Sequence, residues 1–489
     1  MAKFGIPIFA KTKKYKTNVL HQVYTPTDAD PKYLHTHGKV INERIVKTRV
    51  REIFMITLVR VLSSMDTIIN FIHIFLKTLF FKSLCIHINK GFWYHKRMKI
   101  LVICQYYYPE NFIITKFAEQ FVKDGYEVHI LTGKPNYGYG YILPAYKNIN
   151  EEIINGVNVH RVNIIPRKNS RFSIINNYLS FWKLSKKWVS KTKIKFDCVY
   201  SMSLSPVTIC SAGNLYSKKH DVPHIIHCLD LWPESVLVTK AVKEKSLTYK
   251  ALYHWSRSIY KNSSKILVSS PSFVEYFDKV LRLPTDDISF VPQSSLIEDS
   301  DIIPYEYGKG THILYCGNLG LIQLIPLITA AMDKLRDQDI YFHIIGMGPM
   351  TDFLINDIRE RRLGDKVIYH GPIIAKHAAS YFKNADAIYI SLKGEGSVGR
   401  TIPSKLQMSM AFGRPIIGVL KGDGRDVISA SGGGFLAEEN SDSVRDAIMA
   451  IHNLTPKEKE RLGALNRRYY ETHFSLREVT SLIEKNFTK

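Results

Sequence analysis

The sequence predicts an α/β protein with two doubly wound parallel sheets that face a central crevice. Three observations lead to this fold class. The chain has 489 residues, more than one ordinary hydrophobic core accommodates. Apolar runs of strand length alternate with helical segments, as expected for parallel strands that are covered on both faces. The series stops in polar stretches between residues 283 and 309 and then begins again, so the second half repeats the architecture of the first.

The first half opens with a β-α-β unit, which predicts a right-handed crossover in a doubly wound sheet. Its strands are expected at residues 99–103 and 128–131, with a helix at 115–123 that Gly125 closes. Further strands are expected at 198–200, 224–227 and 265–269.

The second half has the same rhythm. Strands are expected at 312–316, 341–345, 367–369, 387–392 and 415–420. One helix is expected at 324–335 and another from Ser404, where Pro403 and Gly413 are typical start and stop residues. Because ligands of such folds bind at the carboxyl ends of the strands, the loops there are the candidate site.

Four segments follow from this reading: a basic extension (1–97), two sheet domains (98–293 and 294–455), and C-terminal helices (456–489) that we expect to pack back toward the first domain. The extension holds seventeen Lys and Arg against five acidic residues. Its longest uncharged apolar run, 67–76, is too short to span a membrane. It could lie in a membrane interface, pack on the enzyme, or precede a true start at Met98, and we favour the last.

The net charge of +23 indicates an anionic partner, such as phosphorylated ligands or a membrane surface. No nucleic-acid-binding module accompanies the charge, so nucleic acid is not expected. The six cysteines are scattered without a Cys-x-x-Cys pair, which suits a reduced cytoplasm. We expect no secretory signal, since the first lysines are not followed by an apolar core.

Five phrases carry a resemblance to a known family: QYYYPE at 105–110, LTGKPNY at 131–137, DLWPES at 230–235, CGNLG at 316–320 and TIPSKLQ at 401–407. In these, residues 98 to about 487 resemble the glycosyltransferase family 4 enzymes, which have the GT-B fold of two Rossmann-like domains. The most similar group transfers fucosamine or fucose in bacterial O-antigen and capsule synthesis. Residues 1–97 have no counterpart in the pattern.

The resemblance implies a retaining glycosyltransferase. Its donor would be a nucleotide sugar, expected to be UDP-linked and to carry a 6-deoxy, N-acetylated sugar. Its acceptor would be a saccharide on a polyprenyl diphosphate, at the cytoplasmic face of the cell membrane, with the enzyme peripheral to that membrane. The two alternatives are a nucleotide-sugar 2-epimerase of the same fold and an inactive scaffold that binds sugar nucleotides.

The helix from Ser404 is the expected diphosphate site, because unpaired N–H groups at a helix amino terminus bind anions. Ser404 could add a hydroxyl donor and Lys405 a charge. The alternative is that Ser404 only caps the helix and Lys405 is solvated. The full set of expected donor-binding residues is Gly317, Asn318, Gly320, Lys393, Arg400, Thr401, Ser404 and Lys405.

Two carboxylates are the expected catalytic residues. Asp230 follows a first-domain strand and could act as base toward the acceptor hydroxyl or stabilise positive charge at the sugar carbon. It could instead, or in addition, cap the helix near Trp232. Glu395 is the only acid in the loop 393–400 and could accept hydrogen bonds from donor-sugar hydroxyls. Many family members have two glutamates eight positions apart here, but this chain has Arg400 and Met408.

The acceptor is expected at the loops after the first two strands, at Glu110, Asn111, Lys134 and Asn136. No metal or other cofactor is expected. Metal-dependent glycosyltransferases of the other major fold hold Mn²⁺ or Mg²⁺ with an Asp-x-Asp at a strand end. The matches at 28–30 and 337–339 lack that context.

Overall fold

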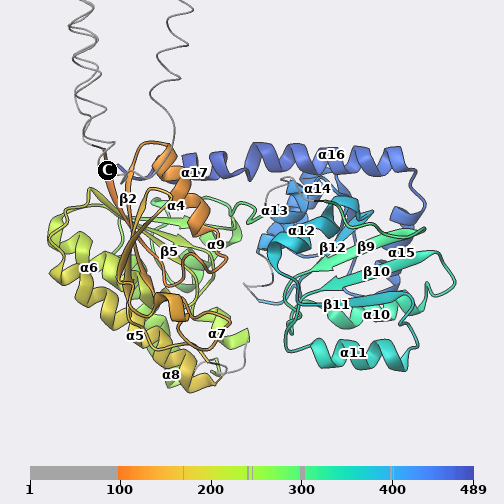
Figure 1. Ribbon diagram of the computed structural model, residues 1–489, viewed down its shortest axis with the longest axis horizontal. Coiled ribbons are helices and arrows are strands. Elements are labelled where there is room, and N and C mark those ends of the chain that lie inside the picture. The colour runs from red at the N-terminus through yellow and green to blue at the C-terminus, as the bar shows by residue number, and fades with distance from the viewer. Residues whose placement is uncertain are drawn as a thin grey trace, which may run out of the picture. The chain divides into compact units, whose positions relative to one another are not determined.

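The computed structural model describes residues 97–488, apart from 169, 239–241, 245, 298–302, 397, 398 and 400. Two α/β domains occupy this range, each built on one mostly parallel sheet with helices on both faces (Figure 1). The predicted fold class is confirmed. The extension, residues 1–97, lies outside the described residues except for Arg97, so its three interpretations stay predictions.

The first domain has an eight-stranded sheet in the order β3-β4-β2-β1-β5-β6-β7-β8. All neighbours are parallel except β3 and β4, which are antiparallel. The strands are β1 (Lys99–Ile103), β2 (Glu127–Gly133), β3 (Glu151–Ile154), β4 (Val157–Val162), β5 (Cys198–Ser203), β6 (His224–Cys228), β7 (Lys265–Val268) and β8 (Ile288–Phe290).

Both faces of this sheet are buried, because successive side chains of a strand point to opposite sides. In β1, Leu101 and Ile103 join one hydrophobic cluster, and Ile100 and Val102 join another. The covering helices are α4 (Ile114–Lys123), α5 (Arg171–Lys191), α6 (Ser211–His220), α7 (Glu234–Val238), α8 (Leu247–Lys261) and α9 (Ser272–Glu275).

The second domain has a six-stranded parallel sheet in the order β11-β10-β9-β12-β13-β14. Its strands are β9 (Thr311–Cys316), β10 (Ile340–Ile345), β11 (Val367–Gly371), β12 (Ala387–Ser391), β13 (Ile416–Val419) and β14 (Gly434–Leu436). Its helices are α10 (Ile325–Asp333), α11 (Thr351–Glu360), α12 (Ala375–Asn384), α13 (Ser404–Ala411), α14 (Asp423–Ser431) and α15 (Ser441–His452).

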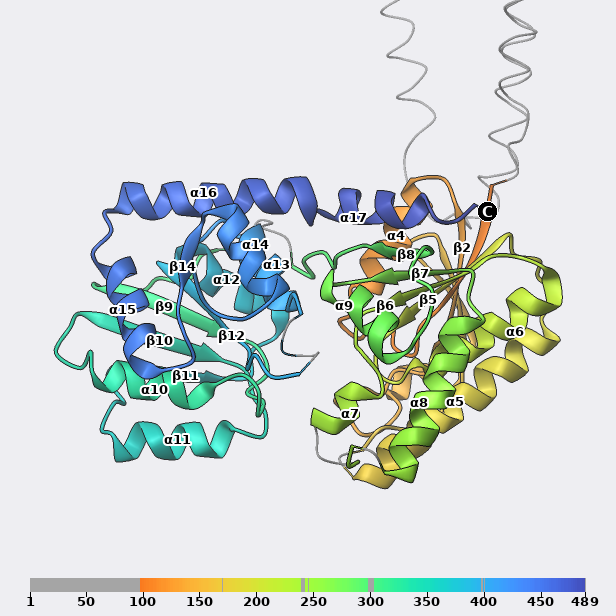
Figure 2. The ribbon, with the colours of Figure 1, turned by 180° about the vertical axis from the view of Figure 1, so that it is seen from behind.

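Two C-terminal helices connect the domains (Figure 2). Helix α16 (Pro456–His473) starts with a capping box between Thr455 and Glu458 and packs on α13 and α14. Helix α17 (Leu476–Glu484) packs on α4 of the first domain. Just beyond it, the Phe487 ring lies 5.2 Å from that of Phe121 in α4, so the chain ends in the core of the domain where the fold began.

Two hydrogen bonds also join the domains at loops that follow strands. The Ile402 N–H donates to the Ser270 hydroxyl at 2.8 Å, and the Ser272 N–H donates to the Asp423 carboxylate at 2.8 Å. Ser270 and Ser272 follow β7, whereas Ile402 and Asp423 precede or begin α13 and α14. These bonds bring strand-end loops of the two sheets together beside the amino terminus of α13.

Candidate functional site

Helix α13 begins as the sequence predicts, with Ser404 as its first residue. The N-cap residue is Pro403, in an extended conformation, and its carbonyl accepts from the Leu406 N–H at 2.8 Å. Among the residues that the structure describes, no side chain caps this helix end, and Ser404 is exposed. The interpretation of Ser404 as a cap is therefore wrong.

Lys405 is half-buried, and its ammonium is bonded within the protein. Its ammonium donates to the Tyr315 hydroxyl at 2.6 Å and lies 4.2 Å from the centre of the Tyr315 ring. The Tyr315 hydroxyl in turn donates to the Asn318 carbonyl at 2.6 Å. Burial lowers the pKa of Lys405 to about 8, opposed by the Cys316 thiol. In the described part of the chain, no carboxylate pairs with this ammonium, so it lacks a counter-charge.

The turn after β9 lies against the same lysine. Gly317 has a φ of +144°, and a Cβ there would lie 2.3 Å from Lys405 Cε. Gly320 is buried, and a Cβ there would lie 2.2 Å from Gln323 Oε1, a buried atom without a hydrogen-bond partner in the described residues. Asn318 is exposed. The structure thus brings Gly317, Asn318 and Lys405 together.

The loop after β12 holds the other predicted donor residues. Lys393 Nζ pairs with Glu395 Oε1 at 2.9 Å, and the Glu395 side chain is 76% exposed. The Gly394 N–H donates at 2.8 Å to Glu439, a carboxylate after β14 that the sequence analysis missed. Thr401 is half-buried, and Arg400 lies outside the described residues. The roles assigned to these residues remain predictions.

Asp230 follows β6 and has an exposed side chain, but the surrounding protein still displaces water from its carboxylate. This desolvation raises the pKa of Asp230, opposed by a hydrogen bond from the Ser205 backbone. Helix α7 begins only at Glu234, four residues later. The capping interpretation of Asp230 is therefore wrong, and its role as a base stays a prediction.

The predicted acceptor residues lie at the ends of β1 and β2, but most of their polar atoms are used internally. Glu110 is buried and accepts from the Asn136 N–H at 2.7 Å and the Tyr137 N–H at 2.5 Å. The buried Asn136 side chain contacts the Lys134 carbonyl and the Arg167 N–H. Lys134 donates to the Lys147 carbonyl, and Asn111 is exposed. Their acceptor roles remain predictions.

Neither membrane-spanning helices nor metal clusters appear in the described ranges. No helix there is long and apolar enough to cross a membrane. Within the same ranges, no group of three His, Cys, Asp or Glu side chains is arranged to hold a metal ion.

Family models match both domains. Residues 112–293 match a glycosyl transferase 4-like domain, and residues 310–454 match the glycosyl transferases of group 1. A probable glycosyltransferase, WbjE of Pseudomonas aeruginosa, is 23% identical over 39% of this chain and 50% of its own length. A putative colanic acid biosynthesis glycosyl transferase, WcaI of Escherichia coli K12, is 24% identical over 65% of this chain and 82% of its own length. The match to WbjE thus spans half of that relative.

Solved structures share the fold. Sucrose-phosphate synthase from Thermosynechococcus elongatus has a TM-score of 0.60 at 16% identity, over 80% of this chain and 98% of its own. Anabaena HepE, in complex with UDP and glucose, has a TM-score of 0.57 at 13% identity, over 80% and 99%. At these identities the likeness identifies the fold, which is GT-B, and nothing finer.

Proposed function

This chain carries the two domains of a family 4 glycosyltransferase, and on that premise we propose that it transfers a sugar from a nucleotide diphosphate to a lipid-linked saccharide in surface polysaccharide synthesis. The two curated relatives, one of them named for colanic acid biosynthesis, support this class of pathway. UDP in the HepE structure supports a UDP-linked donor. The 6-deoxy, N-acetylated sugar rests on the sequence resemblance alone.

The observation that carries the proposal is the uncompensated Lys405 ammonium at the start of α13. A desolvated charge without a counter-charge is costly, and a diphosphate would supply that counter-charge. Free N–H groups of the first helical turn favour an anion at the same place. Gly317 lets the turn after β9 approach the same point.

The proposed reaction retains configuration and needs no nucleophile from the protein. The bond from the sugar C1 to the acceptor oxygen forms as the bond from C1 to the diphosphate oxygen breaks. The proton of the acceptor hydroxyl passes to the leaving diphosphate by way of the Asp230 carboxylate, which accepts it and then releases it. Lys405 and the α13 N–H groups would stabilise the negative charge that grows on this leaving group, the main catalytic device.

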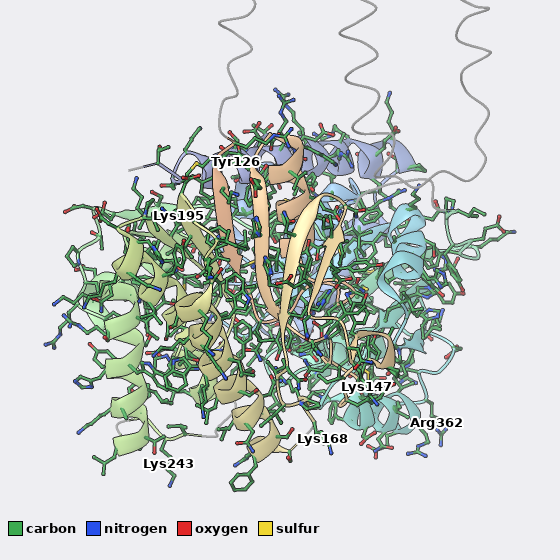
Figure 3. The ribbon with its side chains drawn as sticks, turned by 60° about the vertical axis from the view of Figure 1, so that its left-hand side comes forward. Tyr126, Lys147, Lys168, Lys195, Lys243 and Arg362 are labelled. Atoms are coloured by element: carbon green, nitrogen blue, oxygen red, sulfur yellow. The ribbon has the colours of Figure 1, made fainter. Side chains whose placement is uncertain are left out.

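Helix α5 supports a peripheral contact with an anionic membrane. Phe172, Ile175 and Leu179 form a stripe on its outer face, with 82%, 52% and 44% of each residue exposed. Residues 153–196, which include this helix, contain ten Lys and Arg and no acid. Figure 3 shows Lys168 and Lys195, which flank α5, toward opposite ends of the domain. Exposed apolar side chains among lysines are typical of binding to an anionic lipid surface.

Calorimetry tests the donor site. Lys405→Ala should weaken UDP by about 1.5–3 kcal/mol, the range for hydrogen bonds to charged groups, and leave uridine nearly unchanged. Lys366→Ala is the matched control, because Lys366 donates to the Gln338 carbonyl in the same domain, outside this site. A parallel turnover assay uses a panel of UDP-sugars and membrane extract as acceptor.

Equal losses of affinity for UDP and uridine would mean that Lys405 does not bind the phosphate. Binding without any sugar transfer or donor hydrolysis would favour the scaffold. Isomerisation of the donor without an acceptor would favour the epimerase.

A further inference from the structure

Two arginines six residues apart have different partners. Arg161 is buried and has a counter-charge. Its Nε pairs with Glu152 at 2.5 Å, and its Nη2 donates to the Tyr108 carbonyl at 2.6 Å. Among the described residues, the Arg167 guanidinium bonds only tyrosine hydroxyls, Tyr178 at 2.9 Å and Tyr106 at 3.4 Å. In the described residues no carboxylate pairs with Arg167.

Aromatic rings surround the Arg167 guanidinium. Its central carbon lies 5.2 Å from the Tyr137 ring centre and 5.5 Å from that of Tyr178. Burial raises the pKa of both Tyr106 and Tyr178, so their hydroxyls are neutral at physiological pH. These contacts orient the cation but do not neutralise it. The half-buried guanidinium therefore keeps a full positive charge.

Arg167 follows β4 and Asp230, the proposed base, follows β6, so both residues lie at the carboxyl edge of the first sheet, and Arg167 is fixed in place. Tyr178, whose pKa is raised mainly by burial and slightly by the charge of Asp230, bonds Arg167. Tyr106, which also bonds Arg167, lines one small cavity with Ser205, whose backbone bonds Asp230. The Arg167 backbone N–H donates to Asn136 at 2.8 Å, which ties this loop to the loop after β2. The Tyr137 ring beside it is 43% exposed.

We propose that Arg167 binds a phosphate group of the acceptor and so orients the acceptor hydroxyl toward the Asp230 side of the site. This inference rests on the proposed function. A guanidinium presents paired N–H donors that match phosphate oxygens, and this one has no internal carboxylate to displace. The phosphate has two possible sources, the lipid linkage or a phosphorylated saccharide.

The test uses the full chain with Lys405→Ala, which removes the other phosphate site. Calorimetry with geranyl diphosphate and with glucose 1-phosphate should show binding of at least one ligand. Adding Arg167→Gln should weaken that binding at least tenfold. Arg167→Lys keeps the charge but loses the paired N–H donors, so its affinity should lie between those of Arg167 and Arg167→Gln. Arg257→Gln is the matched control, since Arg257 donates to the Leu281 and Arg282 carbonyls, and should change neither affinity. The same titrations on the unmodified chain saturated with UDP give a second route.

Tighter binding of geranyl diphosphate would assign the phosphate to the lipid linkage, and tighter binding of glucose 1-phosphate to the saccharide. Unchanged affinity in Arg167→Gln, or no binding of either ligand before that substitution, overturns the proposal. A third result also overturns the proposal: Arg167→Gln with Lys405 intact loses UDP binding and melts at a lower temperature. Arg167 would then support the fold. If the chain binds these phosphates through Arg167 but transfers no sugar, the proposed function fails and the site stands.

Discussion

Gly317 and Lys405 fit against each other so closely that a side chain at 317 would displace the lysine. A Cβ at Gly317 would lie 2.3 Å from Lys405 Cε and 2.8 Å from its Nζ. The glycine also has a φ of +144°, which other residues rarely adopt. The position of the lysine ammonium therefore depends on a glycine 88 residues earlier in the chain.

We predict that Gly317→Ala weakens UDP about as much as Lys405→Ala does, and that the double variant is no weaker than either. Both changes would remove the same contact, so their effects should not add. Backbone strain at residue 317 should also lower stability by about 1–3 kcal/mol. Gly364→Ala is the control, because a Cβ there has no atoms within 4 Å. Additive losses of UDP affinity would mean that Gly317 contacts the nucleotide independently of Lys405.

The lowered pKa of Lys405 predicts opposite pH effects on binding and on stability. Above about pH 8 the unliganded lysine loses its proton, so UDP affinity should fall as pH rises through that value. In the unfolded chain the lysine titrates near 10.5, so between these pH values the unfolded state binds more protons and stability without ligand should rise. Titration calorimetry and urea melts at several pH values measure both. Lys405→Ala should flatten both profiles relative to wild type; a profile that persists in this variant belongs to another group.

The sequence predicted most of the strands because parallel strands buried on both faces are continuous apolar runs. Strand β1 matches its predicted range, and β9 and β10 each begin one residue earlier than predicted. Helix α5 was missed for the opposite reason. Its buried face includes Asn177 and Ser185, whereas Phe172 and Leu179 are exposed, so the apolar residues do not mark the inner face.

The site was predicted in part, because a sequence shows which residues follow strands but not whether their polar atoms are already bonded. Glu110 illustrates this limit: it follows β1, yet it bonds backbone N–H groups of the next loop. Tyr315 shows a second limit, since an aromatic residue inside a strand is typical of the core. Only the fold places its hydroxyl against Lys405.

Activity should survive excess chelator, because we propose that Lys405 and the α13 N–H groups replace the cation that other glycosyltransferases use. Asp337 and Asp339 lie between α10 and β10, outside the loops that carry the donor site. The measurement is turnover after dialysis against EDTA, with and without added Mn²⁺ or Mg²⁺. Loss of activity in EDTA and recovery with Mn²⁺ would contradict the proposed leaving-group stabilisation.

Asp230→Asn should separate chemistry from folding. The carboxylate is proposed to take part in proton transfer at the acceptor hydroxyl, so turnover should fall about a hundredfold or more. Stability should not fall. Desolvation raises the pKa of Asp230, so the folded state binds more protons than the unfolded state just above the ordinary carboxyl pKa of 3.8. At neutral pH the charged carboxylate is therefore a small cost to stability. Removing that charge should leave the melting temperature unchanged or slightly higher. UDP affinity should also be unchanged, because the donor phosphates are assigned to the other domain.

If turnover is normal, Asp230 is not the base, and the acceptor proton must pass to the leaving diphosphate without help from this carboxylate. If turnover and stability fall together, Asp230 supports the fold after β6.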